Sequence, residues 1–161
     1  MIFTLENVLN SLAAVLKEKY PQYPVYYSPN QQGTDFPCFF IFYMPSTIEG
    51  QLSERFIRDL GIDIVFVQQR NIVNGNAEVM AIAEYLDEVL ELVSYLNQSL
   101  DDGKVKEAEE KASAFLRTFE RQWKSEDEEL HYQFHIRQRV AVPQEAIPME
   151  EMEENIYAKG K

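Results

Sequence analysis

The amino-acid sequence predicts an α+β fold in which two helices pack on a mainly antiparallel sheet. Apolar residues recur every three to four positions near the start of the chain and again near its middle, which predicts two amphipathic helices. Between and after these helices, apolar and polar residues alternate, which predicts strands with one face toward the core and one toward water. The expected order of elements is α-β-β-β-α-β-β.

The first helix is expected over residues 5–19. Thr4 has a side chain suited to capping its N-terminus, and Pro21 cannot continue a helix. The apolar positions of this segment fall on one face, and they are Leu5, Val8, Leu9, Leu12, Val15 and Leu16. A helix with one apolar face needs a surface to cover, so we expect it to lie on the sheet.

Three strands are expected to follow the first helix. A short β-rich run over residues 25–27 leads through a polar loop, residues 30–35, into the continuously apolar run 38–44. Because that run is apolar at every position, it predicts a strand buried on both faces, or a strand with one core face and one interface. After a polar link at 45–50, residues 52–67 alternate and predict a long strand with one wet face.

A second helix and a closing hairpin complete the predicted domain. Helical spacing of apolar residues extends over residues 78–98, whereas residues 101–111 form a charged link whose structure stays open. Residues 115–123 and 130–142 are β-rich and flank a polar link at 124–129. The second of these runs alternates regularly, as a half-buried antiparallel strand does.

The length and charge of the chain bound its organisation. Its 161 residues suit a single domain, expected over residues 1–142, followed by an acidic and flexible tail over residues 143–161. The formal net charge of -12 argues against wrapping nucleic acid or binding an anionic membrane, because both depend on Lys and Arg. No run approaches the ~20 apolar residues of a membrane span. The single cysteine, Cys38, excludes an internal disulfide and indicates an intracellular protein.

No motif in the sequence indicates catalytic, cofactor or metal chemistry. The six glycines are too dispersed to form a phosphate-binding loop. His131 and His135 share one face of a predicted strand, but four residues separate them by roughly 13 Å, so they cannot bind one metal ion together. No charged residue lies within two positions of Cys38, whereas a reactive thiolate needs a positive neighbour. We therefore expect no catalytic residue, no cofactor and no metal, and hence not an enzyme.

Two features of the sequence point to contact surfaces. Residues 20–43 are rich in tyrosine, which favours interfaces but also packs in ordinary cores. The second predicted helix carries acidic residues with no Lys or Arg among them, and pairs such as Glu84 and Glu88 repel each other at four-residue spacing. Such a face is simply solvated, meets a basic partner, or lines a passage through which DNA slides without sticking. The sequence leaves these alternatives open.

Several segments stand in a distinctive order along the chain. They are the opening helix ending at Tyr20-Pro21, then Gln31-Gln32-Gly33, Phe36-Pro37-Cys38-Phe39-Phe40-Ile41, Arg55-Phe56-Ile57-Arg58, Ile62-Asp63-Ile64-Val65-Phe66, the helix from Glu78 to Leu92, and the two closing strands. This order resembles that of the small tail terminator, or tail completion, proteins of long-tailed bacteriophages and prophages. The resemblance covers residues 1–142 and lies in order and spacing together.

The resemblance implies a structural virion protein that assembles with copies of itself into a ring, expected to be a hexamer. Such a ring would cap the tail tube protein, stop its elongation and present a surface to the head connector protein. DNA would pass through without sequence-specific binding, and the protein would lie at the tail end of the virion after assembly in the host cytoplasm. Either the outer face of residues 78–91 or the loop 45–53 would point into the channel or toward the tube. The residues expected at this assembly or channel surface are Ile48, Glu49, Gln51, Arg55, Arg58, Glu84, Asp87, Glu88 and Glu91.

Two other functions fit the same sequence. A small-ligand-binding α+β domain, or an enzyme that uses carboxylates in a cleft, would need a deep pocket with converging polar groups. An adaptor would use the acidic tail, residues 143–161, to bind a basic partner.

Overall fold

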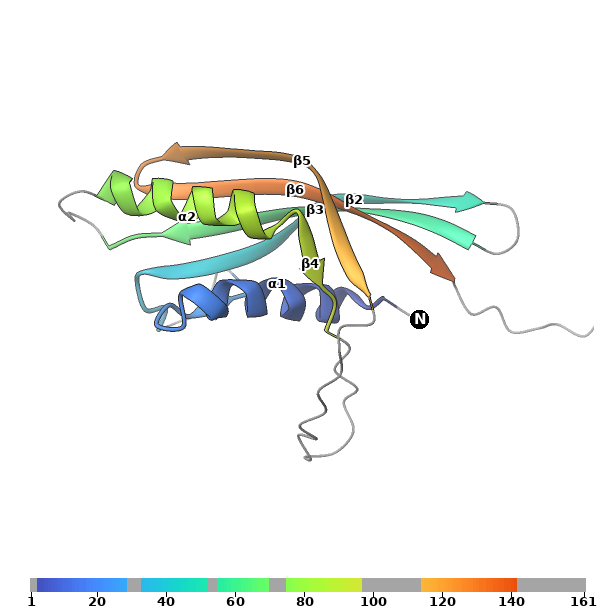
Figure 1. The fold of residues 1–161 in the computed structure, drawn as a ribbon, viewed down its shortest axis with the longest axis horizontal. Helices are drawn as coiled ribbons and strands as arrows, with labels where there is room; N and C mark the ends of the chain where they lie inside the picture. The colour runs from blue at the N-terminus through green and yellow to red at the C-terminus, as the bar shows by residue number, and fades with distance from the viewer. Residues whose placement is uncertain (1–2, 29–32, 52–54, 70–74, 97–113, 142–161) are drawn as a thin grey trace, which may run out of the picture.

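A computed structural model describes residues 3–28, 33–51, 55–69, 75–96 and 114–141. Both helices lie on one face of a six-stranded sheet (Figure 1). The elements are α1 (Leu5–Lys19), β1 (Val25–Tyr26), β2 (Cys38–Gln51), β3 (Arg55–Val67), α2 (Gly75–Val89), β4 (Leu92–Ser94), β5 (Phe115–Glu126) and β6 (Glu129–Ala141). The strand order is β1-β2-β3-β6-β5-β4, and among these described strands the β1–β2 pair is parallel while the other neighbours are antiparallel. The predicted α+β class is confirmed.

Helix α1 has the predicted bounds. The hydroxyl of Thr4 accepts a hydrogen bond from the Asn7 backbone N–H over 3.1 Å and so caps the first turn. The stripe of Val8, Leu12 and Leu16 is buried in the core. Packing of this stripe on the sheet, and not helix propensity alone, stabilises a helix of only 15 residues.

The core lies between the two helices and one face of the central strands. On β3 the residues that point toward the helices are at most 2% exposed, and they are Leu60, Ile62, Ile64 and Phe66. Their cross-strand partners on β6 are equally buried, and they are Ile136, Phe134, Tyr132 and Leu130. The alternation predicted for both strands is therefore confirmed, and the opposite parity forms an outer face that the helices do not cover.

The predicted link at 45–50 is wrong, because β2 continues through it to Gln51. The strand accommodates Pro45 by a β-bulge between Met44 and Thr47, since proline cannot donate to a regular ladder. The Ser46 hydroxyl accepts a hydrogen bond from the backbone N–H of Gly61 over 3.2 Å and closes the bulge against β3. The expectation that the apolar run is buried on both faces holds for residues 38–41, where Cys38 and Phe40 join a small cluster on the outer face.

The second helix ends earlier than its spacing predicts, at Val89 instead of residue 98. Residues Leu92–Ser94 pair with β5 as a strand, because Val93 can be buried beside Leu116 just as well as on a helix. The closing turn is also tighter than the predicted link at 124–129. Asp127 and Glu128 have φ of 49° and 66°, as a two-residue hairpin turn requires. Residues 52–54, the whole charged link at 101–111 and the acidic tail at 143–161 lie outside the described residues.

Candidate assembly surfaces

The ends of β2, β3 and β6 extend beyond the region that the helices cover (Figure 1). We call this extension the arm and define it as residues 47–51, 55–59 and 137–141. Its register pairs Thr47 with Asp59 across β2 and β3, and Asp59 with Arg137 across β3 and β6. The arm therefore gathers Ile48, Glu49, Gln51, Arg55 and Arg58, five of the residues expected from the sequence at an assembly surface.

The arm has two faces of different chemistry. On the same side as the helices, Ile48, Arg58 and Gln138 form one row of cross-strand partners. Ile48 is 57% exposed. On the outer side, Glu49 and Arg139 flank Ile57, and both charged side chains are exposed.

The row on the helix side of the arm holds buried polar atoms without partners. Arg58 donates one hydrogen bond through Nη2, over 3.2 Å to the backbone oxygen of Phe3, but its Nε is buried and unpaired. Gln138 is 6% exposed, and neither its amide oxygen nor its amide nitrogen has a hydrogen-bond partner. Each such group costs roughly 1 to 3 kcal/mol. Among the described side chains, only one other polar atom, Asp63 Oδ1, is buried without a hydrogen-bond partner. Such atoms are therefore concentrated in the arm.

The second group of expected residues lies on α2 and directly after it. Glu84, Asp87, Glu88 and Glu91 are exposed, and we call them the acidic helix face. Asp87 also has a structural role, because its Oδ1 accepts a hydrogen bond from the Tyr132 hydroxyl over 2.6 Å. Burial and then the Asp87 carboxylate raise the pKa of Tyr132 above its usual value.

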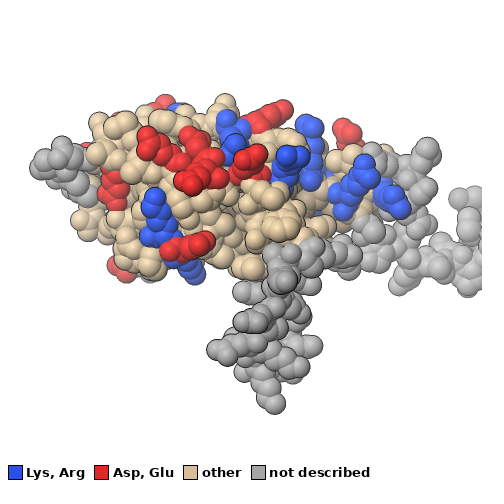
Figure 2. Space-filling model, in the orientation of Figure 1, with Lys and Arg blue, Asp and Glu red and all other residues tan. Residues whose placement is uncertain are grey.

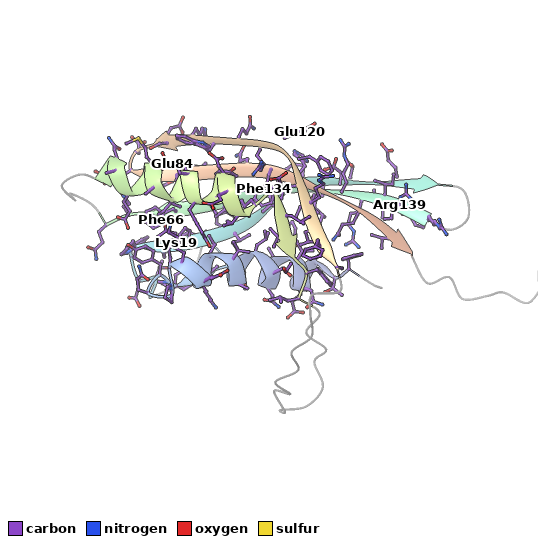
Figure 3. The ribbon with its side chains drawn as sticks, viewed as in Figure 1. Lys19, Phe66, Glu84, Glu120, Phe134 and Arg139 are labelled. Atoms are coloured by element: carbon purple, nitrogen blue, oxygen red, sulfur yellow. The ribbon has the colours of Figure 1, made fainter. Side chains whose placement is uncertain are left out.

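The structure thus divides the nine expected residues between two separate surfaces. Figure 2 shows acidic side chains gathered over α2 and basic side chains gathered toward the arm. Figure 3 shows the same separation for Glu84 on α2 and Arg139 on the arm. Sequence reasoning placed both groups on a single candidate list, but the fold holds them apart.

Two aspartate–histidine pairs on the outer face were not predicted. His135 Nδ1 lies 2.7 Å from Asp59 Oδ1, and Arg137 Nε donates to Asp59 Oδ2 over 3.1 Å. One repeat further along the strands, His131 Nδ1 lies 3.1 Å from Asp63 Oδ2. Burial raises the pKa of Asp59, but the hydrogen bonds and positive charges of His135 and Arg137 outweigh it and hold the pKa below its usual value. The matching four-residue spacings on β3 and β6 are visible in the sequence, but only the register shows that they meet.

Exposed aromatic residues on β5 also escaped the sequence argument. Phe115, Phe119 and Trp123 are between 37% and 56% exposed. The guanidinium carbon of Arg137 lies 5.6 Å from the centre of the Phe119 ring, a cation–π contact. Aromatic residues and arginine are enriched in protein interfaces, so β5 is a further candidate contact edge.

The described residues show no arrangement typical of catalysis. No group of three or more His, Cys, Asp or Glu among them could hold a metal ion. Burial raises the pKa of the Cys38 thiol to about 11, so it is protonated and unreactive at neutral pH. Several of the clustered tyrosines pack against the core. The rings of Tyr20 and Tyr23 are stacked with their centroids 5.8 Å apart, and both contact Phe39. None of the helices in the described part of the chain is long and apolar enough to span a membrane.

Comparison with known families identifies the class of protein. A family model described as "Phage tail terminator protein" matches residues 7–148, which is most of the chain. This protein is therefore a structural protein of phage tails, and it belongs to the phage tail terminator family. The resemblance predicted from the order of the segments is confirmed. No curated protein matches the chain.

Proposed function

We propose that this protein closes the end of the tail tube as a ring of identical subunits, stops tube elongation and presents the surface that the head connector binds. The family match over residues 7–148 is the observation that carries this proposal. In the virion the ring lies at the tail end, and it assembles in the host cytoplasm. A six-fold ring is the expected size. A ring of identical subunits closes through heterologous contacts, in which two different surfaces of the same chain meet.

The charge of the arm favours one kind of partner over another. The arm carries four arginines against Glu49 and Asp59. Arginines facing a channel would bind the phosphate backbone of passing DNA, because they release its condensed counterions. The arm is therefore proposed to contact protein, either a neighbouring subunit or the tube.

The acidic helix face fits two occupants. Passing DNA would be repelled from carboxylates and would slide freely, which suits a channel wall. A basic protein surface would be attracted to the same carboxylates. Both roles belong to a ring assembled on a tube, and neither requires a ligand pocket or a reaction.

Electron microscopy of tails tests the proposal. Tails assembled without this protein should show tubes of uncontrolled length and few joined heads, because nothing stops polymerisation of the tube protein. Adding the purified protein to growing tubes should stop their elongation and leave visible density at one end. As a matched control, a destabilised core variant, Leu12→Asp, should fail to stop elongation at the same concentration. Tubes of normal length and full head joining in the absence of the protein would overturn the proposal.

A further inference from the structure

We infer that, in the ring, the arm of one copy docks on the acidic helix face of the next copy. This inference rests on the proposed ring and adds the two surfaces that meet in it. The occupant of the arm is thus a second copy of this chain. The same contact explains the arginines of one surface and the carboxylates of the other.

The two surfaces are placed as a heterologous contact requires. The arm is formed by the ends of β2, β3 and β6 that project beyond the helices (Figure 1). The acidic helix face lies on α2, which covers the other part of the sheet. A subunit can therefore offer its arm to one neighbour and its α2 to another at the same time. Repetition of one such contact produces a ring when the rotation closes.

Some charges on each surface form no ion pair among the described residues. Arg55 and Arg139 are exposed, and no described carboxylate forms an ion pair with either. Glu84, Glu88 and Glu91 likewise form no ion pair with any described basic residue. Complementary charges across an interface steer association and select the correct partner.

Two described basic residues near α2 are already engaged within the chain. Arg121 donates a hydrogen bond to the backbone oxygen of Asp87 over 2.7 Å. Lys19 lies 4.5 Å from the ring centre of Tyr85, in a cation–π contact. Within the described residues no basic side chain forms an ion pair with Glu84, Glu88 or Glu91, and the arm of a second copy can supply such cations.

The arm also shows features of an unfinished contact besides its charge. The Arg58 Nε and the Gln138 amide nitrogen are buried donors without acceptors, in the same cross-strand row as the exposed Ile48. These groups lie on the helix side of the arm, whereas Arg55 and Arg139 lie on its outer side, so the contact with the acidic helix face rests on the two arginines.

A charge-swap experiment tests this contact. Variant A is Arg55→Glu with Arg139→Glu, and variant B is Glu84→Arg with Glu88→Arg. Each alone should weaken self-association about tenfold or more, because like charges then face each other at every contact. An equimolar mixture of A and B should restore association to within about threefold of the unchanged protein, since every A–B contact is complementary again. A ring of six can alternate the two variants and still close.

The matched control reverses two exposed lysines that lie outside both surfaces, Lys17→Glu with Lys124→Glu. This control has the same charge change as variant A and should assemble like the unchanged protein. Self-association is measured by sedimentation equilibrium and, on purified tubes, by the fraction of tube ends that carry a ring. Folding of every variant is checked by thermal unfolding.

The outcomes separate this inference from the proposed function. If the unchanged protein caps tubes but the mixture of A and B stays impaired, the inference is overturned and the proposed function stands. If variant B assembles normally but now retains double-stranded DNA, the acidic helix face lines the channel and the inference is again overturned. If the unchanged protein neither assembles nor caps tubes, the proposed function itself fails.

Discussion

The hydroxyl of Tyr132 donates a hydrogen bond to Asp87 Oδ1 over 2.6 Å, which joins the centre of the sheet to the acidic helix face. Tyr132 is completely buried, whereas Asp87 is exposed. The position of these carboxylates is thereby tied to the core. A change at Asp87 therefore has two effects, one on the fold and one on the surface, and the two can be separated.

Replacing Tyr132 by phenylalanine should lower the free energy of unfolding by about 1 kcal/mol at pH 7, through loss of the hydrogen bond to Asp87. Asp87→Ala, which removes the acceptor, should cost a similar amount, while Glu88→Ala on the same exposed face should be close to neutral. Urea unfolding followed by circular dichroism measures all three. Equal stabilities of the Asp87 and Glu88 variants would show that the hydrogen bond contributes nothing.

The raised pKa of Tyr132 makes a prediction at alkaline pH. The folded protein holds this hydroxyl protonated, so the hydroxyl contributes fully to the free energy of unfolding below the unfolded-state pKa of about 10. This contribution is lost as the pH rises further. The stability difference between the unchanged protein and Tyr132→Phe should therefore shrink above pH 10. Thermal unfolding at pH 8, 10 and 11 measures it, and a constant difference would contradict the prediction.

The lowered pKa of Asp59 makes the opposite prediction at acidic pH. A carboxylate whose pKa is lower in the folded than in the unfolded state stabilises the fold at pH values above the unfolded-state pKa of about 3.9. This stability is lost as the pH falls through the pKa of the folded state. Asp59→Asn should thus destabilise the protein by about 1 kcal/mol at pH 7 and by progressively less below pH 4. Glu126→Gln, at an exposed pair with Lys124, serves as the control and should show little pH-dependent difference.

Replacing Gln138 by leucine should stabilise the isolated subunit by about 1 kcal/mol, because it removes two buried polar atoms that have no partner. Leucine adds no donor or acceptor, and its side chain is one bond shorter than that of glutamine. If docking supplies the missing partners, the same variant should assemble more weakly even though it unfolds at higher denaturant. A lower midpoint of unfolding would mean that the amide is already satisfied in the subunit.

The Ser11 side chain links α1 to the segment after β4. Its hydroxyl donates to the Asn7 backbone oxygen over 2.6 Å and accepts from the Leu96 N–H over 2.9 Å. Ser11→Ala should cost about 1 to 2 kcal/mol, because the Leu96 N–H loses its partner in a half-buried site. Ser94→Ala, at an exposed position, should cost little, and hydrogen exchange at Leu96 should accelerate only in the Ser11 variant.

Local patterns were enough to predict α1, the long alternating strands and the α+β class. Thr4 and Pro21 delimit α1 through backbone chemistry that acts within a few residues. Apolar and polar residues alternate on β3 and β6 because one face of each strand is buried, so the sequence of each strand shows the pattern by itself. The candidate residues on β2, β3 and α2 were expected from the family resemblance, and for α2 also from its run of carboxylates without Lys or Arg, which one segment displays.

Only the tertiary structure decided how these segments meet. Pro45 predicted a link, but β2 continues through it with a bulge that the Ser46–Gly61 hydrogen bond closes. Val93 fitted the helical spacing, but it pairs with Leu116 of β5 as part of a strand. The pairing of Asp59 with His135 joins residues 76 positions apart, and no local pattern specifies such a register. The sequence by itself determined which faces are apolar and which are charged. The sheet determined that the basic arm and the acidic helix face stand apart, because their separation depends on strand pairings between distant segments.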